Sequence, residues 1–327
     1  MVRFGVVGTN FITDELIRCG RQVQDFQLTA VYSRTEERAR EYAGRHGAAH
    51  WFTDLAVMAQ SHEMDAVYIA SPNSFHASQA ILCMQQGKHV LCEKPLASNV
   101  REAEAMFQAA RENGVLLMEA MKTLFLPNFQ AVKDALPEIG RVRRYMAQFC
   151  QYSSRYDRYL QGERPNTFQP EFSNGALMDL GVYCIQPLIA LFGRPKEVRA
   201  NAVMLPTGVD GEGSLLLNYG EMEAVIFYSK ISDSALPAEI QGEQGRLQMD
   251  KVSRPDKITL IKNGQSFDRS RQQADHMTYE IAEFIRLIQN GQIESPVQSF
   301  DQSLAVMKIV EAARRQTGIR YPADLDD

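Results

Sequence analysis

The feature that most constrains the fold is the regular alternation of short apolar runs with amphipathic segments along the first third of the chain. The expected strands span residues 2–8, 28–32, 50–52, 66–70, 89–92 and 115–118. Helix-forming segments separate them, and parallel neighbours in a sheet need such crossover helices. The order therefore predicts an α/β fold that begins with a doubly wound parallel sheet.

Beyond about residue 122 the pattern changes to paired strands. The runs 213–219 and 223–228 flank Gly220, and Asn263-Gly264 suits the type I′ turn of a hairpin. A chain of 327 residues is also too long for one ordinary core. We expect residues 1–122 to form one domain and residues 123–327 to form a second, with a large, mainly antiparallel sheet.

Composition excludes several classes of partner. A net charge of −5 and a pI near 5.8 leave no electrostatic footprint for nucleic acid. We find no charged leader and no apolar run near the ~20 residues of a membrane span, so we expect no membrane partner and a cytoplasmic protein. Five scattered cysteines without a CxxC pair, and histidines without ligand spacing, predict neither disulfides nor a metal site.

A turn after the first strand has the order of a dinucleotide-binding fingerprint. The segment Gly8-Thr9-Asn10-Phe11-Ile12 joins the strand to a helix, although Asn10 and Thr13 occupy the usual places of the second and third glycines. Asn tolerates a left-handed backbone, and a helix N-terminus presents free N–H groups to a pyrophosphate. We expect residues 8–12 to bind a dinucleotide, while a similar turn before a helix also occurs without a ligand.

The second strand ends in Ser33-Arg34 where NAD-preferring sites carry an acid. A 2′-phosphate needs donors and positive charge, so Ser33 and Arg34 favour NADP(H) over NAD(H), with Arg38 one helical turn away as a second candidate. NAD(H) remains possible. The alternative is a solvated helix face, and we prefer that interpretation for Arg40 and Arg45.

Glu93-Lys94-Pro95 places two charges where the strand 89–92 stops. Carboxyl ends of parallel strands face the ligand crevice of an open sheet, so a lysine there can reach a bound molecule. The alternative is a strand that ends in a solvated salt bridge.

An otherwise apolar helix expected at 176–192, capped by residues 173–175, carries Asp179 and Tyr183. Their i, i+4 spacing puts both side chains on one face. Gly181 between them costs roughly 1 kcal/mol relative to alanine, which predicts a close approach at this position. The alternative is an Asp and a Tyr that only hydrogen-bond on a helix surface.

Four stretches, residues 5–12, 71–76, 87–96 and 175–183, together resemble the Gfo/Idh/MocA oxidoreductase family over essentially the whole chain. The resemblance implies a Rossmann domain followed by an α/β domain whose open sheet often mediates dimerisation, and hence a homo-oligomer. It also implies hydride transfer between NAD(P) and a hydroxyl or carbonyl carbon of a small sugar, polyol or diol.

By resemblance the reacting residues are Lys94, Asp179 and Tyr183. Tyr183 is the expected proton donor and acceptor, and a nearby ammonium favours its phenolate form. Lys94 polarises the substrate oxygen, and Asp179 orients a substrate hydroxyl or holds Lys94. The remaining cofactor contacts implied by the family are Ser71, Pro72, Asn73, Glu93 and His76, of which His76 is equally consistent with helix packing.

The substrate remains open. Tyrosine at 183 is closer to the dihydrodiol dehydrogenase branch than to the inositol branch, and Leu124-Phe125-Leu126-Pro127 replaces a more polar stretch of many relatives. Tyr152, Arg155 and Tyr156 are further candidate contacts, or ordinary packing on a surface strand. A catalytically silent sensor or scaffold, and a sugar–sugar oxidoreductase with tightly bound cofactor, are the alternatives.

Overall fold

The computed structural model describes residues 1–325 and contains two compact units. The first comprises Met1–Lys122 and Ala274–Phe300, and the second comprises Thr123–Gln273 and Asp301–Asp327. The chain first passes between the units at the expected position, after residue 122. Residues 274–300 depart from the expected division, because they return to the first unit instead of completing the second.

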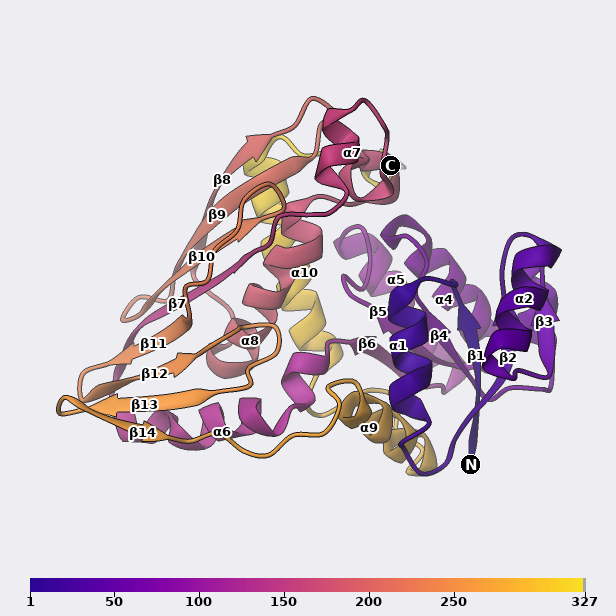
Figure 1. The fold of residues 1–327 in the computed structure, drawn as a ribbon, viewed down its shortest axis with the longest axis horizontal. Helices are drawn as coiled ribbons and strands as arrows, with labels where there is room; N and C mark the ends of the chain where they lie inside the picture. Colours follow the sequence, from indigo (N-terminus) through magenta and orange to yellow (C-terminus); the bar gives the residue numbers. More distant parts are fainter. Residues whose placement is uncertain (326–327) are drawn as a thin grey trace. The chain divides into compact units, whose positions relative to one another are not determined.

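The first unit is built on a six-stranded sheet with the order β3-β2-β1-β4-β5-β6 (Figure 1). Every neighbouring pair in it is parallel, which confirms the predicted doubly wound sheet. Its strands are β1 (Val2–Val7), β2 (Phe26–Tyr32), β3 (His50–Phe52), β4 (Ala66–Ile69), β5 (His89–Glu93) and β6 (Leu117–Ala120).

Crossover helices occupy the expected places between these strands. They are α1 (Phe11–Gly20), α2 (Glu36–His46), α3 (Leu55–Gln60), α4 (His76–Gln85) and α5 (Val100–Asn113). Asp54 caps α3 and Asn99 caps α5, although the preceding residues, Thr53 and Ser98, are also suitable caps by residue type. In each case the carboxylate or amide oxygen accepts from main-chain N–H groups of the first turn.

The returning segment is fixed to the first unit through α9 (Thr278–Gln289) and its flanking loops. Arg18 on α1 donates to Asp275 over 2.5 Å, and the rings of Phe284 and Phe4 lie 5.8 Å apart. The N–H of Leu117 on β6 donates to the carbonyl of Ile293 over 3.1 Å. These contacts explain why residues 274–300 belong to the first unit.

The second unit is built on an eight-stranded sheet with the order β14-β13-β12-β11-β7-β10-β9-β8. It is antiparallel except for the pair β7 and β10, so the prediction of a mainly antiparallel sheet is confirmed. Its strands are β7 (Val142–Cys150), β8 (Glu197–Met204), β9 (Asp210–Asn218), β10 (Glu223–Ser229), β11 (Ala238–Gly242), β12 (Gly245–Met249), β13 (Ile258–Lys262) and β14 (Gln265–Asp268).

Both predicted hairpins are present in this sheet. Gly220, with a φ of 92°, lies in the connection between β9 and β10. Asn263 and Gly264 join β13 to β14 with φ values of 52° and 74°, as a type I′ turn requires.

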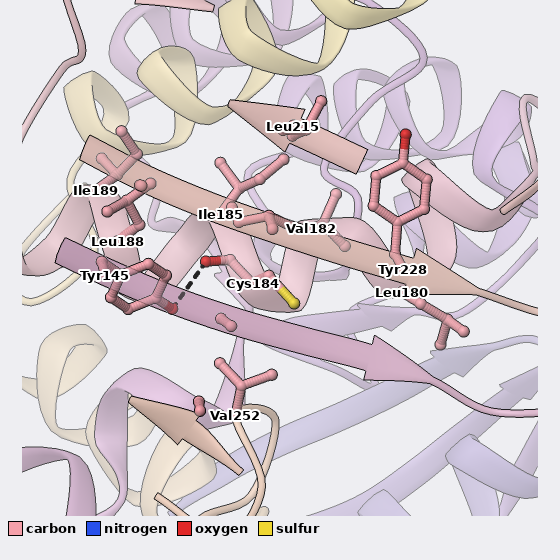
Figure 2. Packing of buried hydrophobic residues seen from close by; sticks show 14 of the residues in the cluster. Tyr145, Leu180, Val182, Cys184, Ile185, Leu188, Ile189, Leu215, Tyr228 and Val252 are labelled. Carbon is pink, nitrogen blue, oxygen red and sulfur yellow. Dashed lines mark hydrogen bonds between the residues drawn. The ribbon is translucent and has the colours of Figure 1, made fainter. Parts of the chain in front are cut away.

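Helices cover one face of this sheet, where its apolar core lies (Figure 1). The helices of the second unit are α6 (Pro127–Ala135), α7 (Tyr156–Leu160), α8 (Val182–Phe192) and α10 (Phe300–Thr317). Figure 2 shows α8 side chains packed against the strands, with the hydroxyl of Tyr145 donating to the carbonyl of Cys184 over 3.0 Å. Contrary to expectation, Pro170–Phe192 is apolar enough to cross a membrane, but 72% of its most apolar window is buried, as in a core helix.

The start of the helical segment that leads into α8 is held by a distant carboxylate. Asp210 on β9 accepts from the N–H of Ala176 over 3.1 Å and from that of Leu177 over 2.7 Å. The expectation that residues 173–175 cap the helix is therefore wrong; Gly175 instead has a φ of 138°, and a Cβ there would lie 2.2 Å from Asp210 Oδ1.

A π-helical turn, Leu177–Gly181, precedes α8. A Cβ at Gly181 would lie 3.1 Å from the ring of Tyr228, which confirms the predicted close approach. Short π-helical segments are frequent at functional sites, and this one carries Asp179.

Burial raises the pKa of Asp210 to about 6. Because this pKa is raised in the folded state, the contribution of Asp210 to the free energy of unfolding is greatest below the unfolded pKa of ~3.9. That contribution falls as the pH rises through about 6. Asp210→Asn removes this titration while keeping an acceptor for the helix. We expect the free energy of unfolding of the variant, relative to wild type, to rise by about 3 kcal/mol between pH 4 and 7.5. Urea unfolding across that range measures it, and a constant difference would contradict it.

Candidate active site

The residues expected to bind the cofactor lie at one edge of the six-stranded sheet. Gly8 follows β1, Ser33 follows β2, Ser71 follows β4, and Glu93 ends β5. Because all the strands are parallel, these four carboxyl ends share the edge at which open α/β sheets bind nucleotides.

The glycine turn closes tightly onto the end of β4. Gly8 has a φ of 109°, and a Cβ on it would lie 2.7 Å from the carbonyl oxygen of Ala70. Asn10 has an extended backbone, with φ −103°, so the expectation of a left-handed Asn is wrong. Its side chain instead caps α1 by accepting from the N–H of Ile12 over 3.1 Å, and donates to Ala70 over 2.9 Å. Only glycine therefore fits at residue 8, and Asn10 fixes the start of α1 beside it.

The arginines after β2 divide into two groups. Arg34 is exposed, and Arg38 donates to the hydroxyl and the carbonyl of Thr9 over 3.1 and 2.9 Å. Arg45 instead pairs with Asp14 over 3.1 Å and lies over the ring of Tyr42. Arg38 is thus fixed beside the glycine turn, whereas Arg45 joins α1 to α2.

His76 joins two of the loops at this edge. It is 1% exposed, and its ring nitrogens lie 2.9 Å from the carbonyl oxygen of Pro95 and 3.0 Å from that of Ser71. Burial and the nearby charge of Lys94 lower the pKa of His76, so the neutral ring donates to one carbonyl at a time. Its contacts are those of a residue that positions the loops carrying Ser71 and Lys94.

Glu93 is buried where β5 ends. Its Oε1 accepts from the hydroxyl of Tyr68 over 2.6 Å, and its Oε2 accepts from the N–H of Lys94 over 3.3 Å. Burial raises the pKa of Glu93, while the charge of Lys94 and the Tyr68 bond oppose that rise. At 8% exposure Glu93 is not part of a solvated salt bridge, and the Lys94-Pro95 peptide bond that follows is cis.

In the second unit, Asp179 and Tyr183 share one helical face. They are the only residues between 175 and 189 that are not buried. The ring of Tyr183 meets that of Phe149 edge-on at 5.5 Å between centroids. Asp179 and Tyr183 are thus the two polar groups that this helical segment exposes together.

A further charged residue, which the sequence analysis missed, contacts Asp179. Lys230 follows β10, forms an ion pair with Asp179 Oδ2 and donates to the hydroxyl of Thr167. The signal was present in the sequence, since Lys230 follows an apolar strand as Lys94 does.

The other candidate substrate contacts differ in their exposure to solvent. Leu124 and Leu126 are 5% and 1% exposed, so they belong to the core rather than to a polar surface. Tyr152 lies in the loop that follows β7, not in a strand, and donates to Asp157 over 2.7 Å. The ring of Tyr152 also lies edge-on to that of Tyr156.

The fold and these motifs define an NAD(P)-linked oxidoreductase. Residues 2–121 match the model of an oxidoreductase family with an NAD-binding Rossmann fold, and residues 129–248 match the GFO/IDH/MocA C-terminal domain. The chain is 53% identical over 99% of both chains to a scyllo-inositol 2-dehydrogenase (NADP(+)) of Bacillus subtilis. The chain belongs to the Gfo/Idh/MocA family and is a dehydrogenase or reductase acting on CH–OH groups.

Two further similarities are informative. A trans-1,2-dihydrobenzene-1,2-diol dehydrogenase of Xenopus tropicalis is 29% identical over 91% of this chain and 92% of its own. A 3-ketoreductase from Actinomadura kijaniata, in complex with NADP and TDP-benzene, has a TM-score of 0.85 at 26% identity, covering 97% of this chain and 98% of its own. Over the whole chain the inositol dehydrogenase is the more similar of these two dehydrogenases, whereas the branch inferred from Tyr183 alone stays a prediction.

Gly8→Ala tests the cofactor half of the site. We expect at least a tenfold loss of NADPH affinity by fluorescence titration, because the new methyl displaces the carbonyl of Ala70 from the glycine turn. Gly47→Ala is the matched control: its φ of 66° is also positive, but nothing lies within 4 Å. Equal losses in both variants would show that backbone strain, and not the turn, controls binding.

Proposed function

We propose that the protein transfers a hydride between NADP(H) and a carbon that carries a hydroxyl or carbonyl group in a small polyol or diol. The observation that carries the proposal is the presence of Lys94, Asp179 and Tyr183 in a chain that is similar over its full length to an NADP-dependent polyol dehydrogenase. Scyllo-inositol is therefore the first substrate to test.

Lys94, Asp179 and Tyr183 are the proposed reacting residues. Bound NADP(H) supplies or accepts the hydride. In the reducing direction negative charge grows on the substrate oxygen, and the Tyr183 hydroxyl donates the proton that neutralises it. The Lys94 ammonium stabilises the same developing charge, and Asp179 accepts a hydrogen bond from a substrate hydroxyl. Glu93, ordered by Tyr68, is proposed to contact the nicotinamide ribose.

Lys94→Ala tests this assignment. We expect NADPH binding within about threefold of wild type and a fall in turnover of roughly 10²–10⁴, since a group that stabilises developing charge is lost. Steady-state kinetics on scyllo-inositol and NADPH titration measure the two effects. Turnover like that of wild type would remove Lys94 from the reaction.

The cofactor preference is proposed to come from Ser33, Arg34 and Arg38. Arg34 is exposed, and Arg38 is held at Thr9 beside the glycine turn, where donors and positive charge suit a 2′-phosphate. Ser71, Pro72, Asn73 and His76 are proposed to shape the groove between the ends of β4 and β5.

Arg34→Ala is expected to weaken NADPH binding by roughly 10- to 100-fold, the effect of one charge-assisted hydrogen bond, and to leave NADH binding nearly unchanged. Arg40→Ala, which removes an exposed arginine on the helix α2 that follows Arg34, is the control and should change neither. Tighter binding of NADH than NADPH by the wild type would overturn the assignment.

We also propose a cytoplasmic homodimer that uses the helix-free face of the eight-stranded sheet. That face exposes Leu216 and Phe227, at 53% and 44%, among the paired charges of Arg144 and Glu223. Exposed apolar side chains surrounded by paired charges are suited to an interface in which the same surface of two copies meets. Sedimentation equilibrium of the purified protein decides it, because a monomer at micromolar concentration contradicts the proposal.

A further inference from the structure

Lys230 is a buried lysine at the end of β10. Its side chain is 5% exposed, while that of its partner Asp179 is 34% exposed. Its main-chain N–H donates to the carbonyl of Gly211 over 2.8 Å, so the start of the side chain is fixed by the sheet. In this ion pair the ammonium is therefore buried and the carboxylate is accessible to solvent.

The ammonium joins the end of β10 to two other segments of the second unit. It forms the ion pair with Asp179 in the π-helical turn, donates to the hydroxyl of Thr167, and lies 5.8 Å from the centre of the Phe168 ring. A hydroxyl and an aromatic face complete the surroundings of the charge. Such surroundings restrict both the lysine and the carboxylate that it holds.

Fold stability alone does not account for this pair. Desolvation of the buried Lys230 ammonium offsets much of its attraction to Asp179, and apolar side chains of similar volume often stabilise a core as well or better. The neighbours of Lys230 along β10, Ile226 and Tyr228, are such core residues. The distinctive result of the pair is a carboxylate with a fixed orientation beside Tyr183.

We propose that Lys230 is a positioning residue that holds the Asp179 carboxylate as a fixed acceptor for a second hydroxyl of the substrate. This inference rests on the proposed function and deepens it. A carboxylate that is already paired with an ammonium is a poor proton acceptor but a good hydrogen-bond acceptor. The site therefore selects molecules with a hydroxyl next to the reacting carbon, namely vicinal diols and polyols.

Lys230→Met keeps the length of the side chain and removes its charge. With scyllo-inositol and NADP, we expect the KM for the polyol to rise about 10- to 100-fold, because a displaced positioning group weakens binding of the substrate. We expect kcat to change less than about threefold and the KM for NADP to stay unchanged, since Lys94 and Tyr183 remain. A general loss of folded protein would instead lower the apparent kcat without selectively raising one KM.

Lys88→Met is the matched control. Lys88 is also buried, at 8% exposure, but it donates only to the carbonyls of Ser61 and Met64 among the contacts described, at the amino end of β5. Its loss should lower the melting temperature without changing either KM. A rise in the polyol KM in both variants would assign the effect to stability and overturn the positioning role.

A double-mutant cycle isolates the pair. Asp179→Asn alone leaves an uncompensated buried ammonium, and we expect it to melt roughly 5–15 °C below wild type. Adding Lys230→Met should restore part of that loss. The polyol KM of the double variant should be little higher than that of Asp179→Asn alone, because both substitutions break the same ion pair. Additive effects on KM would show that Lys230 does not act through Asp179.

The outcomes separate the two proposals. A wild-type protein that oxidises neither scyllo-inositol nor any of a panel of polyols and diols refutes the proposed function, and the role of Lys230 with it. Wild-type turnover with an unchanged polyol KM in Lys230→Met refutes the role of Lys230 alone. A selective rise in the polyol KM, absent from Lys88→Met, supports both.

Discussion

The uniform direction of the six strands in the first unit is the constraint on which the cofactor half of the molecule depends. It brings loops that are far apart in sequence to one edge, and side chains then tie those loops together. Asn10 reaches Ala70, Arg38 reaches Thr9, and His76 joins the loops after β4 and β5. Each tie uses a main-chain carbonyl or a short side chain, so the shape of the edge is fixed before any ligand arrives.

Much of the fold was predictable because its signals are local. Alternating apolar runs and helices fix the order of elements, and Asn263-Gly264 specifies its own hairpin. Helix starts were less predictable, since Thr53 and Asp54 are equally suitable caps until the backbone decides between them. The start of the segment that leads into α8 was not predictable at all, because its cap, Asp210, lies more than thirty residues away along the chain.

The site shows the same division. Lys94, Asp179 and Tyr183 stand out in sequence because they are polar groups in apolar contexts. Lys230 has the same signature, but its meaning depends on Asp179, fifty-one residues earlier. Asn10 was singled out for the wrong reason, since its amide caps a helix rather than permitting an unusual backbone. The sequence shows the type of each residue directly, whereas the side chains that it contacts are known only from the tertiary fold.

The path of the chain through the two units limits how the protein can be dissected. A fragment that stops at Lys122 lacks residues 274–300, and so it loses Asp275, one of the partners of Arg18, and Phe284, one of the rings that pack on Phe4. Its sheet would also have an uncovered edge at β6, where Ile293 normally pairs. Recombination that exchanges one half of such a gene for another must therefore transfer two separated coding segments together, which favours inheritance of this architecture as a single piece.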